Sequence, residues 1–165
     1  MADGSGNLAT RVLRDPVHWI PFGFGAGLLP IAPGTWGSLL AVVLFWLAPP
    51  LPPHIHAIGV AGGFVLGVWL CGISTRRLGA HDHPGIVFDE IVAMWAMLAV
   101  LPRQISWTIM AFLLFRVLDV WKPWPIREAD HRISGGLGIM LDDALAAAFA
   151  AAILLSLRKV AALLT

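Results

Sequence analysis

The 55–75 stretch of the chain contains no charged side chain, and this feature limits the possible folds more than any other. A helix needs about 20 consecutive apolar residues to cross the ~30 Å of hydrocarbon in a bilayer, and this stretch meets that requirement. The composition agrees, because 58% of the residues are hydrophobic and 13% are charged, against about 25% charged in typical soluble domains. These figures also exclude disorder, coiled coils and collagen. We therefore expect an integral membrane protein.

Size and charge restrict the organisation and the partners of the chain. Its 165 residues suit a single domain, 1–165. The net charge of +1 gives no field to attract polyanions, so no nucleic-acid partner is expected. The single cysteine, Cys71, excludes an internal disulfide and a Cys-rich metal site. The polar start lacks the apolar core of a cleavable signal peptide, and we expect residues 1–18 to be a loosely ordered cytoplasmic N-terminus.

Five apolar segments predict an all-α fold, namely a polytopic membrane helix bundle. Proline pairs end the first of these segments, since proline cannot continue a helix. Glycines and prolines also interrupt the apolar stretch 19–33, which indicates an interfacial loop or re-entrant turn rather than a straight helix. The membrane-embedded helices are expected at residues 34–49, 55–75, 86–101, 105–121 and 139–157.

The distribution of lysine and arginine predicts the orientation in the membrane, because cytoplasmic flanks carry an excess of these residues. With the N-terminus in the cytoplasm, the outer flanks hold Arg103, Arg158 and Lys159. The inner flanks then hold the larger set of Arg11, Arg14, Arg76, Arg77, Lys122, Arg127 and Arg132. We therefore expect a multi-pass protein whose N-terminus faces the cytoplasm.

Three charged clusters fall in the apolar segments, and the alternating directions of the helices bring them to the same cytoplasmic end. They are Asp89 with Glu90, Arg116 with Asp119, and Asp142 with Asp143. Charge in a membrane segment costs at least ~2.5–3.5 kcal/mol per residue, so it usually marks function or pairing. The alternative is that these side chains only border the headgroups.

Four carboxylates with basic neighbours are typical of a site for a hard cation such as Mg²⁺, which prefers oxygen ligands. The candidate metal ligands are Asp89, Glu90, Asp142 and Asp143. Adjacent helical residues point ~100° apart, so we expect only one member of each pair to bind a given ion from one side. The other member would orient a base or a second ion.

The remaining candidates lie in loops and helix ends. Arg116 and Asp119 can pair at i, i+3, and Lys122 and Arg127 flank a proline-braced turn. An aromatic belt with positive-inside anchors is the alternative for that turn. The glycine-rich residues 134–138 before Asp142 form a candidate anion cradle at a helix start. The loop with His81, Asp82 and His83 offers zinc ligands or proton donors, or is a plain polar loop.

Cys71 and Arg77 have the Cys-x5-Arg spacing of cysteine-dependent phosphatases. That chemistry needs a thiolate with a lowered pKa in a loop of converging N–H groups. Cys71 instead falls within an apolar helical segment, where a thiol stays protonated. We therefore do not expect it to be a nucleophile.

Four runs of this sequence, which lie in the same order in the family, closely resemble the bacterial phosphatidylglycerophosphatase A family. The runs are GFGAGLLPIAPGTWGSL (23–39), HDHPGIVFDEIVAMW (81–95), FRVLDVWKPWPIREAD (115–130) and GGLGIMLDDALAA (135–147). The resemblance covers about residues 23–152. Ala93 and Ala147 depart from it where the family often has glycine. The resemblance implies a Mg²⁺-dependent lipid phosphatase of the bacterial inner membrane that converts phosphatidylglycerophosphate to phosphatidylglycerol. The predicted orientation puts its site at the cytoplasmic face.

The charged motif positions of the family are occupied here by His81, Asp82, His83, Asp89, Glu90, Arg116, Asp119, Lys122, Arg127, Asp130, Asp142 and Asp143. We hypothesise that Arg116, Lys122, Arg127 and Arg132 bind the substrate phosphate. His81 or His83, with Asp82 between them, would protonate the leaving glycerol oxygen, and Asp119 is a candidate for an aspartyl-phosphate intermediate.

Two other function classes remain open from the sequence. A small cation or proton transporter would need charges distributed through the depth of the membrane. A CDP-alcohol phosphotransferase would need a signature that begins Asp-Gly and places two further Asp at i+4 spacing on a helix, and no such run occurs here. Besides the lipid bilayer and the lipid substrate, no obligate protein partner is expected, and homodimerisation is left open.

Overall fold

The computed structural model describes residues 8–79, 83–124 and 126–164. Throughout these residues the regular structure is helical, without β-strands. The elements are α1 (Leu8–Arg14), the 3₁₀ helices η1 (Pro16–His18) and η2 (Gly23–Leu28), α2 (Pro33–Leu47), α3 (Pro53–Leu78), α4 (Phe88–Val100), α5 (Ile105–Trp121), α6 (Ile126–Arg132) and α7 (Gly135–Leu164).

All five predicted segments form helices, namely α2, α3, α4, α5 and α7, and the all-α fold is confirmed. Two of them, α3 and α7, are long and apolar enough to cross a membrane. The 13 residues of α4, the 15 of α2 and the 17 of α5 give lengths of only ~20, ~22 and ~25 Å. These are short of the ~30 Å of hydrocarbon, so length and composition support two spanning helices rather than five.

The N-terminal segment differs from its prediction. Residues 8–18 form α1 and η1 instead of a loose tail, and Val12 and His18 are buried, with 1% and 3% of their surface exposed. Asp15 caps η1, because its side chain accepts a hydrogen bond from the Val17 amide. Residues 19–33 form an irregular turn rather than a straight helix, as predicted, and Phe24 and Ala32 there have positive φ angles of 53° and 49°.

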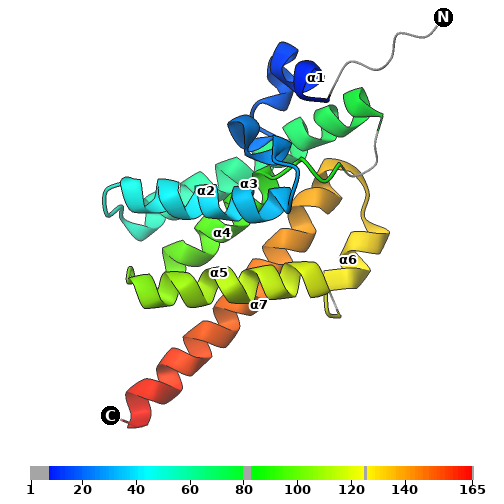
Figure 1. Ribbon diagram of the computed structural model, residues 1–165. Helices are drawn as coiled ribbons and strands as arrows, with labels where there is room; N and C mark the ends of the chain where they lie inside the picture. Colours follow the sequence, from blue (N-terminus) through cyan, green and yellow to red (C-terminus); the bar gives the residue numbers. More distant parts are fainter. Residues whose placement is uncertain (1–7, 80–82, 125, 165) are drawn as a thin grey trace, which may run out of the picture.

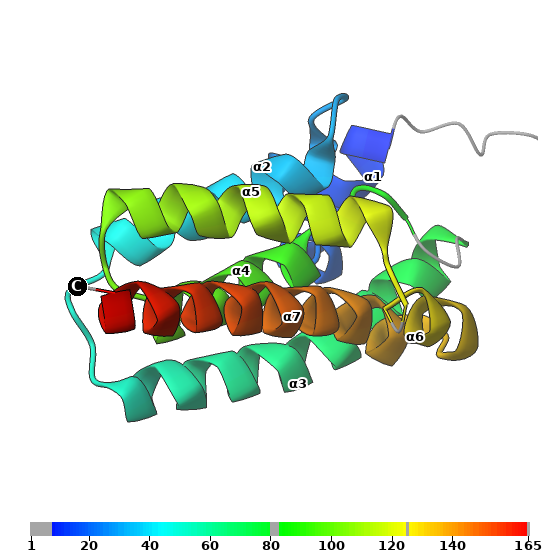
Figure 2. The ribbon, with the colours of Figure 1, turned by 90° about the horizontal axis from the view of Figure 1, so that it is seen from below.

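The five long helices run in alternating directions, so that chain segments far apart in sequence meet at one end of the bundle (Figures 1 and 2). That end contains the first turns of α2, α4 and α7 and the last turns of α3 and α5. The core beneath it consists of two clusters. One, around Phe45, Met94 and Phe115, joins α2, α4, α5 and α7. The other, around Phe22, Cys71 and Met140, joins the N-terminal segment to α3 and α7.

Candidate active site

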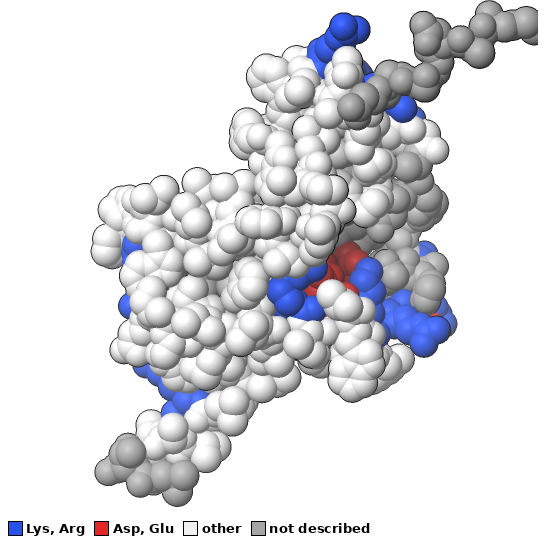
Figure 3. Space-filling model, viewed as in Figure 1, with Lys and Arg blue, Asp and Glu red and all other residues white. Residues whose placement is uncertain are grey.

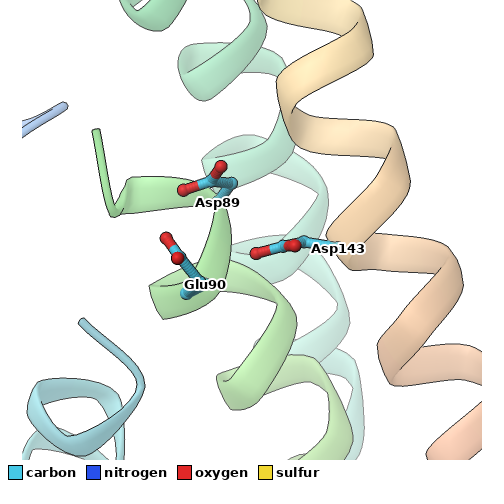
Figure 4. Close-up of side chains that lie close together, drawn as sticks. All are labelled: Asp89, Glu90 and Asp143. Carbon is cyan, nitrogen blue, oxygen red and sulfur yellow. The ribbon is translucent and has the colours of Figure 1, made fainter. Parts of the chain in front are cut away.

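Three carboxylates from two helices meet at the shared end of the bundle. Asp89 and Glu90 lie in the first turn of α4, and Asp143 lies two turns into α7. One oxygen from each of the three lies within 4.8 Å of the others, and all three side chains point into the same space (Figure 4). Residues more than 50 positions apart are therefore gathered into one acidic cluster, which we call the carboxylate cluster.

The membership of the carboxylate cluster differs from the predicted ligand set. Asp89 and Glu90 both belong to it, and the prediction that only one of each acidic pair binds a given ion from one side stays a prediction. Of the second pair only Asp143 belongs, and Asp142 lies outside. Asp142 instead forms an ion pair with Lys122, at 2.6 Å between Oδ2 and Nζ.

Each member of the carboxylate cluster has one oxygen that is buried without a hydrogen-bond partner among the residues that the structure describes. These atoms are Asp89 Oδ1, Glu90 Oε2 and Asp143 Oδ2. Buried polar atoms are nearly always satisfied in folded proteins, and a buried carboxylate oxygen left without a partner carries a desolvation cost. A set of ligands that consists of carboxylate oxygens only, some of them unsatisfied, fits a hard divalent cation such as Mg²⁺.

Arg116 connects the carboxylate cluster to two other helices. Its Nη1 lies 2.8 Å from Asp119 Oδ2, which confirms the predicted i, i+3 pair, and 3.7 Å from Glu90 Oε1. The same nitrogen donates a hydrogen bond to Ser38 Oγ on α2 at 3.4 Å. Asp119 in turn lies within hydrogen-bonding reach of Asp143. The guanidinium is thus held between carboxylates, and its N–H donors, which lie in one plane, suit a carboxylate or a phosphate.

Lys122 reaches the site because the backbone reverses at the end of α5. The residue is the C-cap of α5, with a φ of 44°, and Pro123 follows it. Since proline prevents the helix from continuing, the chain turns there. The Lys122 ammonium then contacts Asp142 on α7. In Figure 3 acidic side chains are visible in a recess that Lys and Arg side chains flank.

The other predicted phosphate-binding residues lie on α6 and are exposed. Arg132 forms an ion pair with Glu128 at 2.5 Å, and 76% of its side chain is exposed. Arg127 lines a hollow next to the site together with Lys122, Trp121 and Trp124. Both tryptophans are largely exposed, at 74% and 82%, which is the position expected of an aromatic belt.

The histidine loop is described only in part. His81 and Asp82 lie outside the described residues, as does the side chain of Asp130. The His83 ring packs against Phe22, with 5.5 Å between ring centroids, and its Nδ1 accepts a hydrogen bond from the Gly85 amide at 3.0 Å. His83 is not a member of the carboxylate cluster.

Sequence reasoning assigned no role to the start of α2, yet it forms one wall of the site. A Cβ on Gly34 would lie 1.9 Å from Glu90 Oε1 and 3.2 Å from Arg116 Nη1, so only glycine leaves room for them. The helix N-terminus also places its partial positive charge beside the Glu90 carboxylate. Gly34 and Ser38 lie four residues apart on one helix face, a spacing that indicates close packing.

The glycine-rich start of α7 has a packing role. A Cβ on Gly136 would lie 1.9 Å from the Val68 carbonyl oxygen, and one on Gly138 would lie 2.0 Å from that of Ile133. Gly136 therefore lets α7 approach α3 closely, and Gly138 leaves room for the backbone of Ile133, just before α7. That approach sets the position of Asp143, and anion binding by this turn stays a prediction.

Together, the fold and the site define a class of protein: an all-helical chain, apolar enough for a membrane, with carboxylates gathered beside cations at one end of the bundle. The family model for phosphatidylglycerophosphatase A matches residues 19–158, and the chain belongs to this family. The resemblance stated from the four runs is thereby confirmed over most of the chain.

Individual relatives agree. Phosphatidylglycerophosphatase A of Escherichia coli (strain K12) is 44% identical over 143 residues, which cover 86% of this chain and 83% of the relative. The protein of the same name from Haemophilus influenzae is 43% identical over 148 residues, 88% of this chain and 91% of the relative. A Bacteroides thetaiotaomicron protein proposed to be a phosphatidylinositol-3-phosphatase is 33% identical over 135 residues, 77% of this chain and 84% of the relative. No solved structure is significantly similar to the chain.

Proposed function

We propose that this protein is a Mg²⁺-dependent phosphatase of the bacterial inner membrane, which hydrolyses the terminal phosphate monoester of phosphatidylglycerophosphate to give phosphatidylglycerol. The observation that carries this proposal is the carboxylate cluster, whose ligand atoms lie within 4.8 Å of one another beside Arg116. Membership in a family named for this activity supports the substrate.

The residues divide into those that hold a cation and those that bind phosphate. Asp89, Glu90 and Asp143 would hold the Mg²⁺, which when bound neutralises phosphate charge and activates water. Arg116 and Lys122 would bind non-bridging phosphate oxygens. Both cations form ion pairs with carboxylates, Arg116 with Asp119 and Lys122 with Asp142. Because monoester hydrolysis without a catalyst is extremely slow, most of the rate enhancement must come from such charge stabilisation.

Hydrolysis also needs a proton for the leaving group. The attacking water forms a bond to phosphorus, the bond between phosphorus and the glycerol oxygen breaks, and that oxygen takes up a proton. His81 or His83 would supply it, since an imidazole titrates near neutral pH. Asp119, within reach of Asp143, is the candidate nucleophile if the reaction passes through an aspartyl phosphate instead.

The position of the site at one end of the bundle suits a lipid substrate, because the headgroup can enter while the acyl chains stay in the bilayer. The exposed Trp121 and Trp124 support an interfacial level for this end. The excess of lysine and arginine in the flanks of the same end supports a cytoplasmic orientation. A transporter would need carboxylates along the bundle, whereas residues 91–118 and 144–165 contain none.

The test measures phosphate release by the purified, detergent-solubilised protein from phosphatidylglycerophosphate, without any CDP-linked donor. We expect release with Mg²⁺, none with EDTA, and recovery when Mg²⁺ is returned. The Cys71→Ser protein should keep full activity, because Cys71 is buried in α3 and is not a member of the carboxylate cluster. Absence of release under all these conditions would contradict the proposal, and faster release from phosphatidylinositol 3-phosphate would redirect it to another headgroup.

A further inference from the structure

We propose that the apolar groove between α3, α4 and α7 holds one acyl chain of the lipid substrate while its phosphate occupies the carboxylate cluster. This inference rests on the proposed function and deepens it. The groove has a volume of about 220 Å³ and is lined by Val60, Phe64, Asp89, Val92, Ala93, Ala96, Met97, Val100, Met140, Ala144, Ala147, Ala148 and Ala151. We call it the α4–α7 groove.

The α4–α7 groove begins at the active site. Among the described residues that line it, only Asp89 is charged, and Asp89 belongs to the carboxylate cluster. Every other lining side chain is apolar. A molecule that fills the groove is therefore apolar along its length. At the end beside Asp89 it carries a group that binds a cation held by the carboxylate cluster. A phospholipid with a phosphate headgroup has this arrangement.

The length of the groove matches one leaflet. Its lining on α4 runs from Asp89 to Val100 on one helix face, a rise of roughly 16 Å at 1.5 Å per residue. Half of the ~30 Å hydrocarbon thickness is about 15 Å. A chain that starts at the headgroup level beside Asp89 would thus end near the bilayer midplane, at Val100.

The groove owes its space to the small side chains of α7. Ala144, Ala147, Ala148 and Ala151 supply that wall, and none of them reaches beyond Cβ. Ala148 is exposed and Ala96 is partly buried, so the groove opens sideways and a chain can enter from the bilayer. A volume of about 220 Å³ drawn out along α4 is too narrow for a protein helix, whose diameter is about 10–12 Å.

A neighbouring groove on the other face of α4 provides a matched comparison. It lies between α2, α3 and α4, has a volume of about 360 Å³ and shares Val60 and Val92 with the first. It includes His56, whose Nδ1 accepts a hydrogen bond from Trp95 Nε1 at 3.1 Å. This groove contains no carboxylate of the cluster, so a chain in it would not begin at the phosphate site.

The test narrows the α4–α7 groove with Ala96→Leu and Ala148→Leu and compares substrates of different chain length. Ala61→Leu is the control, because Ala61 is exposed on the outer face of α3 and gains the same volume. For phosphatidylglycerophosphate with long chains we expect KM to rise about tenfold in the groove variants, since apolar burial of the chain is lost. With dihexanoyl chains, kcat/KM should stay within twofold of the parent protein, and Ala61→Leu should change neither substrate.

Several results would contradict the proposal that the α4–α7 groove holds an acyl chain and would leave the phosphatase proposal intact. These are an equal effect on both chain lengths, no effect in either groove variant, or the same effect from Ala61→Leu. A second measurement does not depend on turnover: a phosphatidylglycerophosphate with a diazirine in its acyl chain is photo-crosslinked to the unaltered protein. Crosslinks on the lining residues of α4 and α7 support the groove even if no phosphate is released, and crosslinks confined to the outer face of α3 refute it.

Discussion

Both ends of the helix bundle carry charged side chains, but the partners of these side chains differ. At the site end, carboxylates from α4, α5 and α7 crowd around two cations, Arg116 and Lys122. At the far end, the Arg103 guanidinium donates to the backbone carbonyls of Phe45, Trp46 and Ala48, at 2.6–3.1 Å. It also lies over the rings of Phe45 and Trp46, about 5 Å from each centroid.

The difference lies in what remains unsatisfied. Arg103 caps the C-terminal end of α2, where the last carbonyls of a helix lack partners within the helix. Its guanidinium therefore has a structural role and stabilises the fold. The carboxylate cluster instead keeps buried oxygens without partners in the described part of the chain. Proteins tolerate such departures from good packing mainly at functional sites. The charged groups at the site end therefore lower stability and leave atoms available for binding. The charged group at the far end raises stability and leaves no such atoms.

The largest expected effect comes from Asp143→Asn, which removes one charge from the carboxylate cluster without changing its shape. We expect phosphate release to fall by more than about 100-fold, since even groups that only support metal ligands typically cost 10–100-fold. In EDTA the melting temperature should stay the same or rise, because one of several buried like charges is gone. Phosphate release and thermal unfolding in detergent measure the two effects. A large loss of stability together with the activity would show that this end is also built for stability.

A smaller effect is expected from Gly34→Ala at the start of α2. The new Cβ would lie 1.9 Å from Glu90 Oε1, so Glu90 and Arg116 must shift. A displacement of about 1 Å at a catalytic group can cost ~100-fold, and we expect a loss of roughly 10- to 100-fold in phosphate release. Gly62→Ala is the control, because a Cβ there meets nothing within 4 Å. Full activity in Gly34→Ala would show that the start of α2 does not position the catalytic groups.

The sequence alone predicted the convergence of the charged segments, and it did so through helix direction. Once alternating helices were assigned, Asp89, Asp119 and Asp143 had to lie at one end, whichever side of the membrane that end faces. Helix packing sets finer detail that periodicity does not contain. Asp142 and Asp143 are adjacent, yet only the approach of α7 to α3 at Gly136 decides which of them faces α4 and which faces Lys122.

The N-terminal segment shows why other parts could not be predicted. Residues 8–18 are polar enough to read as a loose tail, and they fold because particular tertiary contacts exist. Asp15 pairs with Arg77 at 2.6 Å, and the imidazole of His18 hydrogen-bonds to Ser74 at 2.7 Å. Both partners lie more than 50 residues away on α3, and a local pattern carries no sign of such a distant contact.

At the far end, Arg103→Met is expected to lower stability and leave catalysis alone. The three carbonyls of α2 would lose a charged donor, and hydrogen bonds to charged groups contribute about 1.5–3 kcal/mol. We expect a loss of about 1–3 kcal/mol in unfolding free energy, with phosphate release per folded molecule unchanged. Arg158→Met, an exposed cation of the same end, is the control and should change neither. A fall in kcat without a fall in stability would break the contrast between the two ends.

The smallest effect concerns the contact of the N-terminal segment with the site end, which depends on pH. Burial lowers the pKa of His18 below its ordinary value of 6.5, although Asp15 acts in the opposite direction. Above pH 6.5 the imidazole is neutral whether the segment is docked or not, so the docked state has its full stability. As the pH falls below 6.5, the undocked segment takes up the proton more readily and docking weakens by at most tenfold per pH unit.

Hydrogen exchange of residues 8–18 between pH 7.5 and 5.5 measures this weakening, after correction for the intrinsic pH dependence of exchange. The His18→Gln variant provides the control, because glutamine can still hydrogen-bond to Ser74 but does not titrate in this range. We expect protection to fall with pH in the parent protein and to stay level in the variant. An equal fall in both would assign the pH response to other groups. Constant protection in the parent would mean that the Asp15 carboxylate, 3.7 Å from His18 Nε2, offsets the cost of burying a charged imidazole.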